Sequence, residues 1–309
     1  GNVFHRRREA GTVWTGGDAA KGTNVFVMDW SDHPHKTQEW YDARKAKATE
    51  AGLLHLFAQE VDRDYASAVE GVIIPGAWVK SCIDAHLVLG FEDDGGWSAA
   101  LDVADGGLDR NAFSARKGVV LRTAVEWGDR DTAVTARRAA GYAAPLAPID
   151  LQYDCIGIGA GVKAEANRLD DEDDMPSGVT FVKWDAGAGP MHPDDRLIEG
   201  DEESPLNKDF YANVKAQGWW LLGRRAEKTH RCVQAGKLLY PVDELMSIDS
   251  TIPLLRQLQK ELSQPTRGQS ARMKMLVNKT PEGTRSPNLG DVVMMAYHPF
   301  TSGYTLDFL

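Results

Sequence analysis

One short stretch constrains the fold more than any other: an apolar run that ends on a lone carboxylate and breaks into a loop. The run, Ser-Ala-Ala-Leu-Asp at 98–102, lies between Gly95-Gly96 and Gly106-Gly107. Apolar runs of about four to eight residues between glycines are typical of buried strands, because a helix needs a longer periodic segment. Asp102 is therefore expected where a buried strand reaches solvent, a position from which a carboxylate can hold a metal ion.

Two later segments have the same design. Residues 149–161 place Asp154 in a second apolar run, and residues 288–297 place Asp291 near the start of an apolar helix. Three isolated carboxylates on three elements predict a convergent site. The competing interpretation is that each Asp caps a helix or is a solvated carboxylate.

The spacing of apolar residues predicts the α/β class. Residues 36–68 have a helical pattern, and a short helix is expected through Trp78 and Ile83. The expected strands are 98–103, 111–116, 118–127, 150–158, 178–184 and 271–278, and the expected helices are 129–143, 160–169, 207–235, 254–262 and one that begins after Ser286-Pro287-Asn288. Three consecutive strands followed by alternating helices and strands indicate a mixed sheet with helices on its faces.

Charge is distributed unevenly along the chain. The formal net charge of −10 argues mildly against a nucleic-acid partner, because phosphate binding depends on Lys and Arg. Residues 267–285, however, carry five basic residues against one acid, Glu282. The basic residues are Arg267, Arg272, Lys274, Lys279 and Arg285, and a second basic cluster contains Arg224, Arg225, Lys228 and Arg231. Either cluster can equally be a solvated face.

Composition excludes several other classes of protein. No apolar run approaches the roughly 18 residues that span a bilayer, and no signal segment opens the chain, so an intracellular protein without a membrane partner is expected. Cys82, Cys155 and Cys232 are far apart, which indicates neither a disulfide framework nor a zinc site. The first residue is Gly, which suggests a piece of a longer chain.

Three motifs, in this order, resemble the acidic motifs of the nuclease domain of the large terminase subunit of tailed bacteriophages. They are Leu-Asp-Val-Ala-Asp-Gly-Gly-Leu-Asp-Arg at 101–110, Tyr-Asp-Cys-Ile-Gly-Ile-Gly-Ala-Gly at 153–161 and Ser-Pro-Asn-Leu-Gly-Asp-Val-Val-Met-Met-Ala at 286–296. The similarity extends to Asn-Lys-Asp-Phe-Tyr-Ala-Asn at 207–213, to Trp219-Trp220, and to His33-Pro34 with Glu39-Trp40-Tyr41. It therefore covers most of residues 30–298.

The resemblance implies an RNase H-like mixed β-sheet flanked by helices, preceded by a mostly helical linker segment. Residues 1–85 are then the trailing part of a motor domain and its linker, and residues 86–309 are the nuclease domain. The implied activity is that of a metal-dependent endodeoxyribonuclease that cuts concatemeric viral DNA during genome packaging. The implied partners are double-stranded DNA, the small terminase subunit and the portal protein, in the cytoplasm of an infected bacterial host, with transient docking on the procapsid.

The residue types suit this chemistry. Phosphodiester hydrolysis by two divalent ions needs oxygen ligands, and Mg²⁺ or Mn²⁺ takes carboxylates. By resemblance, Asp102 is the bridging ligand and Asp154 and Asp291 are flanking ligands. Asp109 and Asp105 are weaker metal-ligand candidates; many relatives have a small residue at the position of Asp105. The five basic residues of 267–285 are expected to hold the DNA backbone, and His298 either orients water or caps its helix.

Other classes are left open. The G-x-x-x-x-G-K-[ST] motif is absent from the 309 residues, so no ATPase activity is expected. Another RNase H-like DNA nuclease, of the resolvase or integrase type, would use the same three acids. A nucleotide-binding module built on Gly157, Gly159 and Gly161 lacks the G-x-G-x-x-G spacing. A non-catalytic DNA- or portal-docking module is the remaining alternative.

Overall fold

The computed structural model describes residues 11–14, 22–50, 57, 61–62, 71–104, 109–198, 200–281 and 284–298. The chain forms two compact units, which are described separately. One contains Gly1–Gly71 with Gln269–Lys274, and the other contains Val72–Gly268 with Met275–Leu309. None of the helices in the described residues combines the length and apolar character that a membrane span needs.

The described residues of the first unit form short strands, a 3₁₀ helix and one longer helix. Its described elements are the parallel two-residue strands β1 (Thr12–Val13) and β2 (Asn24–Val25), the 3₁₀ helix η1 (Trp30–Asp32) and the helix α2 (Gln38–Glu50). Trp30 stacks on Tyr41 of α2 with 4.6 Å between the ring centroids. The helical pattern predicted for 36–68 is therefore seen as α2 over 38–50, and most of its remainder lies outside the described residues.

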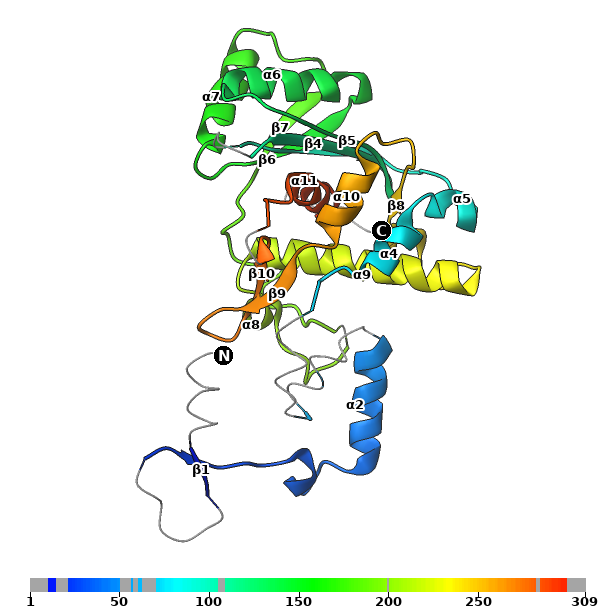
Figure 1. Ribbon diagram of the computed structural model, residues 1–309, viewed down its shortest axis with the longest axis vertical. Coiled ribbons are helices and arrows are strands. Elements are labelled where there is room, and N and C mark those ends of the chain that lie inside the picture. The colour runs from blue at the N-terminus through cyan, green and yellow to red at the C-terminus, as the bar shows by residue number, and fades with distance from the viewer. Residues whose placement is uncertain are drawn as a thin grey trace, which may run out of the picture. The chain divides into compact units, whose positions relative to one another are not determined.

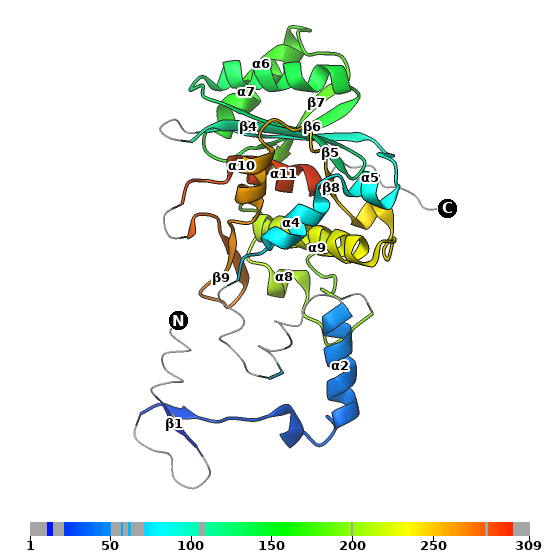
Figure 2. The ribbon, with the colours of Figure 1, turned by 45° about the vertical axis from the view of Figure 1, so that its right-hand side comes forward.

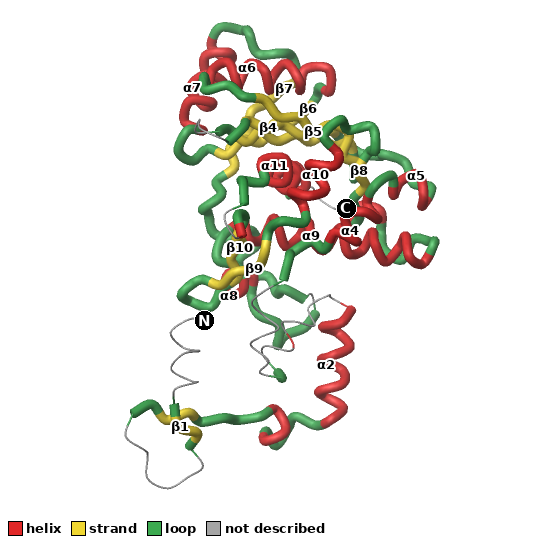
Figure 3. The backbone as a smooth tube through the Cα atoms, viewed as in Figure 1, coloured by secondary structure: helices red, strands yellow, loops and turns green. Residues whose placement is uncertain are grey.

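The second unit is built on a six-stranded mixed sheet, drawn in yellow in Figure 3. Its strands are β3 (Trp97–Asp102), β4 (Asn111–Lys117), β5 (Val120–Trp127), β6 (Ile149–Asp154), β7 (Val179–Trp184) and β8 (Ser247–Ile248). They are ordered β7-β6-β3-β4-β5-β8. The meander β3-β4-β5 is antiparallel, whereas β6 runs parallel to β3, β7 to β6 and β8 to β5.

Helices cover both faces of this sheet (Figures 1 and 2). One face carries α6 (Thr132–Ala143) and α7 (Gly159–Asp171), and η2 (Ala144–Leu146) follows α6. The other face carries α11 (Asn288–Tyr297), with α10 (Leu255–Leu262), α9 (Val214–Ala235), α4 (Gly76–Cys82) and α5 (Ala85–Leu89) around it. All ten residues of α11 are buried, as expected for a helix that is apolar on nearly every side.

Side chains of two strands fix α11 against the sheet. The Ser98 hydroxyl of β3 donates to the Ala296 carbonyl at 3.1 Å, and the Ser114 hydroxyl of β4 donates to the Val292 carbonyl at 2.9 Å. Both hydroxyls are buried and satisfied by these bonds. The register of α11 along β3 is therefore set by hydrogen bonds as well as by packing.

The strand predicted for 150–158 ends earlier, at Asp154. Two other predicted elements also differ from the structure. The helix predicted for 207–235 is divided into α8 (Asn207–Phe210) and α9, because the Asn213 side chain accepts a hydrogen bond from the Ala216 amide and starts a new helix. The strand predicted for 271–278 is the second half of a hairpin of β9 (Thr266–Gln269) and β10 (Met275–Asn278). Met273 has φ +65° in the connecting turn, a conformation that a strand does not allow.

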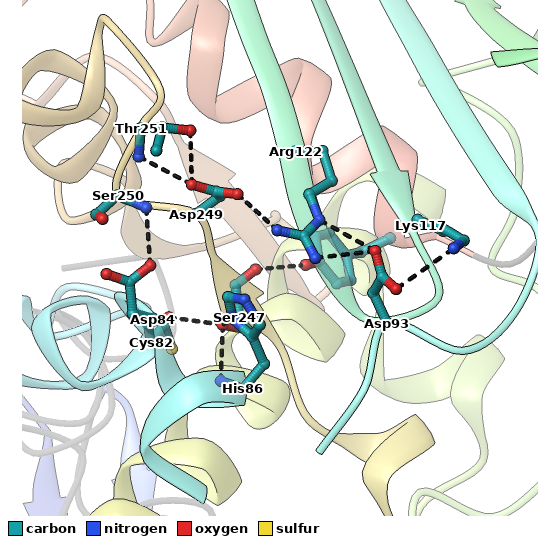
Figure 4. A network of polar contacts seen from close by, with 11 residues as sticks. Cys82, Asp84, His86, Asp93, Lys117, Arg122, Ser247, Asp249, Ser250 and Thr251 are labelled. Carbon is teal, nitrogen blue, oxygen red and sulfur yellow. Dashed lines mark hydrogen bonds and ion pairs between the residues drawn. The ribbon is translucent and has the colours of Figure 1, made fainter. Parts of the chain in front are cut away.

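A polar network joins α5 and the loops beside it to the sheet (Figure 4). The His86 Nδ1 atom lies 2.8 Å from the hydroxyl of Ser247 on β8. Arg122 of β5 donates to Asp93 at 2.9 Å and to Asp249 at 2.6 Å. The network connects α5 and the loop after it, β5, and the segment around β8, which are distant in sequence. The η3 helix (Val242–Glu244) precedes β8.

The network predicts a pH-dependent stability. Burial lowers the pKa of His86, and the positive charge of Arg122 lowers it further. A His with a lowered pKa in the folded state stays neutral there while the unfolded chain takes up a proton, so its contribution to stability is lost as the pH falls below about 6.5. We expect His86→Asn to reduce the fall in the free energy of unfolding between pH 7 and pH 5. Urea titrations at the two pH values measure it, with the exposed His192→Asn as the control; identical pH dependence in wild type and His86→Asn would contradict the assignment.

Candidate metal centre

The three predicted carboxylates come from elements that meet at one edge of the sheet. Asp102 ends β3 and Asp154 ends β6. These strands are parallel neighbours whose preceding residues, Leu101 and Tyr153, are register partners, so their carboxyl ends lie together. Asp291 lies in the first turn of α11, which packs on β3 and β4, and the residue is buried.

Electrostatics connect the three side chains. Burial raises the pKa of Asp102 to about 7, with the charges of Asp291 and then Asp154 contributing further. Burial also raises the pKa of Asp154, against the opposing effect of the Ile156 amide, which donates to its carboxylate at 3.1 Å. Because like charges disfavour one another's ionisation, the contributions of Asp291 and Asp154 to the pKa of Asp102 mean that the three carboxylates lie within electrostatic range of one another.

Two lysines supply the counter-charge. The Lys279 Nζ atom lies 2.5 Å from Asp291 Oδ2, and the Lys215 Nζ atom lies 4.0 Å from the same oxygen. Burial lowers the pKa of Lys279, but the charge of Asp291, the hydrogen bond to it and the charge of Asp102 together outweigh burial, so the net shift is upward. Burial lowers the pKa of Lys215. Sequence reasoning assigned Lys279 to DNA binding and missed Lys215.

Asp291 is held by a third group as well. The Trp219 Nε1–H donates to Asp291 Oδ1 at 3.1 Å, and the Trp219 side chain is fully buried. Trp219 therefore packs in the core, and its indole also orients a carboxylate. One Asp291 oxygen faces the indole and the other faces the ammonium groups.

The donor chemistry of this site fits a hard divalent cation, because carboxylate oxygens are the ligands that Mg²⁺ and Mn²⁺ prefer. Within the described residues, however, no three His, Cys, Asp or Glu side chains are already arranged to hold a metal ion. The Lys279 ammonium bonds Oδ2 of Asp291, and the Trp219 indole bonds Oδ1. A metal ion held by Asp291 would compete with these two groups for its oxygens.

The position of Asp291 depends on a carboxylate that the sequence did not indicate. Glu261 of α10 accepts hydrogen bonds from the amides of Leu289 at 2.7 Å and Gly290 at 3.2 Å, which open the first turn of α11. The other oxygen of Glu261 accepts from Gln257 at 2.7 Å. An acid at a helix N-terminus satisfies amides that have no partner within the helix. Glu261 thus fixes the turn that carries Asp291.

We expect Glu261→Ala to destabilise the protein by about 1–3 kcal/mol, because two buried amides lose their acceptor. Activity should fall with it, since Asp291 lies next to Gly290. Glu261→Gln keeps an acceptor oxygen and should lose less on both measures. Urea unfolding and plasmid cleavage of the two variants test this, and equal behaviour of Ala and Gln would contradict a capping role.

The remaining predicted residues are dispersed. Asp109 is exposed, and Asp105 lies outside the described residues. His298 follows the end of α11, about 10 Å along the helix axis from Asp291, and its buried ring lies 6.2 Å from that of Trp184. The roles proposed for these three residues stay predictions.

The predicted DNA-binding residues occupy different environments. The Arg267 guanidinium lies 5.0 Å from the centroid of the Trp220 ring, and burial lowers its pKa to about 10. Lys279 lies at the carboxylates. Arg272 and Arg285 are exposed, and Lys274 is partly exposed.

The chain has a mixed sheet covered by helices on both faces, with acidic residues at the carboxyl ends of two central strands and on one helix. This architecture is the RNase H-like fold of terminase nuclease domains. The predicted fold is therefore confirmed. The solved structures to which the chain is similar include nuclease domains of the large terminase subunit gp2 of the bacterial virus Sf6. One such structure has a TM-score of 0.65 and 26% sequence identity, covering 74% of this chain and 99% of that chain.

Two further structures of the Sf6 domain agree. A mutant with manganese and beta-thujaplicinol has a TM-score of 0.65 at 26% identity, covering 74% of this chain and 99% of that one. A mutant with calcium has a TM-score of 0.64 at 26% identity, covering 74% and 100%. No protein-family profile and no curated protein matches the chain. The resemblance predicted from the three motifs is confirmed.

Proposed function

We propose that this chain is a metal-dependent endodeoxyribonuclease of viral genome packaging, which cuts concatemeric double-stranded DNA. One observation carries the proposal: Asp102 and Asp154 end neighbouring parallel strands, and Asp291 lies within electrostatic reach of both. The similarity to the Sf6 nuclease domain, whose structures contain manganese or calcium, supports it.

Asp102, Asp154 and Asp291 would hold two Mg²⁺ or Mn²⁺ ions, with Asp102 as the shared ligand. Two such ions supply, when bound, an activated water and stabilisation of the leaving oxygen. The chain's own groups orient the site: the Trp219 indole fixes one oxygen of Asp291, and Glu261 fixes its helix turn. Lys215 and Lys279, once released from Asp291, are close enough to neutralise charge on a bound phosphodiester.

The wider assignment follows the same resemblance. We assign residues 1–85 to the trailing part of a motor domain and its linker, and residues 86–309 to the nuclease domain. The proposed partners are the small terminase subunit and the portal protein, and the proposed location is the cytoplasm of the infected host. We expect no ATPase activity from this chain, because it lacks a phosphate-binding loop.

Incubation with supercoiled plasmid tests the activity. We expect nicked and linear products with Mg²⁺ or Mn²⁺ and none with EDTA. Cleavage that persists in EDTA would contradict a metal-dependent mechanism. DNA binding without cleavage in either metal would favour the docking-module alternative.

A second expectation concerns the hairpin of β9 and β10. Replacing Arg272 and Lys274 by Glu should weaken DNA binding for all sequences alike and flatten its salt dependence, because such residues contact phosphates rather than bases. Fluorescence anisotropy at several salt concentrations measures both effects. Charge reversal at Arg137 and Arg138 on α6 is the matched control, and an unchanged affinity and slope in the hairpin variant would place the DNA elsewhere.

A further inference from the structure

A cavity of about 580 Å³ lies at the opposite end of the sheet from the carboxylates. Its lining includes the start of β3, the strand that ends on Asp102. Along the six residues of β3, the cavity and the carboxylates are therefore roughly 17 Å apart. The size is within the range of small-molecule sites. Parts of β4, α9 and η3 complete the walls.

Two arginines line this cavity, one from the sheet and one from α9. The Nε of Arg116 donates to the Ala296 carbonyl at 2.6 Å, and its Nη1 donates to the Gly118 carbonyl. The Nη1 of Arg225 donates to the carbonyls of Asp243 and, at 2.9 Å, Leu245. Each side chain is thereby held in place, while each guanidinium group retains further N–H donors.

Both guanidinium groups lie beside the same tyrosine ring. Their Cζ atoms lie 5.1 Å and 5.8 Å from the centroid of the same Tyr297 ring. Within the described residues, no carboxylate forms an ion pair with Arg116 or Arg225. Burial lowers the pKa of both, and the charge of Arg225 lowers that of Arg116 further. The cavity therefore has two positive charges in its lining, which backbone carbonyls and the Tyr297 ring stabilise and which, within the described residues, no direct ion pair neutralises.

Arg225 differs in this respect from the other members of its basic cluster. Arg224 and Arg231 both form ion pairs with Glu227, and Lys228 forms one with Glu244. Three of the four cations that the sequence placed together are thus ion-paired with two acids of the same chain. Arg225 instead lines the cavity that Arg116 also lines.

We propose that this cavity binds a small phosphate group, with the guanidinium groups of Arg116 and Arg225 as its ligands. A tetrahedral dianion matches two planar guanidinium forks, which bind phosphate through paired hydrogen bonds. Glu92, Asp94 and Asp243 also line the cavity, and all three are exposed. These acids repel an extended polyanion, so the ligand is free phosphate or a mononucleotide rather than duplex DNA.

Calorimetric titration of the 309-residue chain tests the proposal, in EDTA and at constant ionic strength. The ligands are inorganic phosphate, a deoxynucleoside 5′-monophosphate and a short DNA duplex. The variants are Arg225→Gln and, as a control with the same charge change, Arg137→Gln on the opposite face of the sheet. Arg225 is chosen because Arg116 also bonds the last turn of α11 and its loss can disturb folding.

We expect phosphate, the mononucleotide or both to bind wild type and Arg137→Gln alike, and Arg225→Gln about tenfold or more weakly, the loss typical of one charge-assisted contact. Phosphate binding alone identifies free phosphate as the ligand, and tighter mononucleotide binding identifies a phosphate ester. Equal affinity of wild type and Arg225→Gln, or no binding of either small ligand, would overturn the proposal. So would a duplex affinity that depends on Arg225 while the small ligands do not bind.

Discussion

Asp102→Asn is expected to abolish metal-dependent DNA cleavage while leaving the metal-free protein as stable as wild type or more stable. The substitution keeps the shape of the side chain and removes one of three coupled negative charges. Burial and the charge of Asp291 raise the pKa of Asp102 from 3.8 to about 7, which means that its ionised form is disfavoured in the folded state. Ionisation of Asp102 therefore lowers the free energy of unfolding as the pH rises above 3.8, and the loss is complete once the pH passes about 7.

The stability difference between Asp102→Asn and wild type should accordingly be larger at pH 8 than at pH 5. Mn²⁺ should raise the melting temperature of wild type, since a ligand bound only by the folded state stabilises it, and should do so much less for the variant. Asp150→Asn, on the same strand as Asp154, is the matched control. If Asp102 were only a capping residue, the variant would lose about 0.5–2 kcal/mol and still cut DNA.

Lys279→Met is expected to destabilise the metal-free protein strongly and to make it more dependent on metal. Removing the ammonium leaves Asp291, whose side chain is 3% exposed, with Lys215 at 4.0 Å as its nearest cation. Loss of the cation beside a buried carboxylate lowers the free energy of unfolding by about 3–5 kcal/mol. We expect a loss of about 3 kcal/mol here, because Lys279 is partly exposed. A divalent ion restores the lost positive charge, so the rise in melting temperature on adding Mn²⁺ should exceed that of wild type.

Melting curves with EDTA and with Mn²⁺ measure this effect. Lys260→Met is the matched control, because Lys260 is an exposed lysine of α10 and its loss should change neither curve. Equal melting temperatures of Lys279→Met and wild type in EDTA would show that the ion pair contributes nothing to the metal-free fold.

The strands that carry the carboxylates were predictable because their signals are local. The apolar runs before Asp102 and Asp154 are bounded by glycines or turns, and the structure has β3 and β6 ending on these residues. The mixed sheet followed from the order of the elements. Where local signals compete, prediction was poorer: the cap at Asn213 divides a helix that apolar spacing alone joins.

The lysines at the site were not predictable in the same way. Lys215 and Lys279 come from α9 and from the residue after β10. Only the packing of α9 against α11, and of β10 against α9, brings them to Asp291. In the sequence, Lys279 is one of several basic residues, and nothing separates it from its neighbours. Glu261 is similar, because its function depends on α10 meeting the start of α11.

The central claim is that Asp102, Asp154 and Asp291 together hold the catalytic metal, and anomalous diffraction from crystals soaked in Mn²⁺ tests it most directly. We predict anomalous density between these three carboxylates, with the Lys279 ammonium displaced from Asp291. Manganese bound elsewhere, with the Lys279–Asp291 ion pair intact, in a protein that cuts DNA would contradict the account.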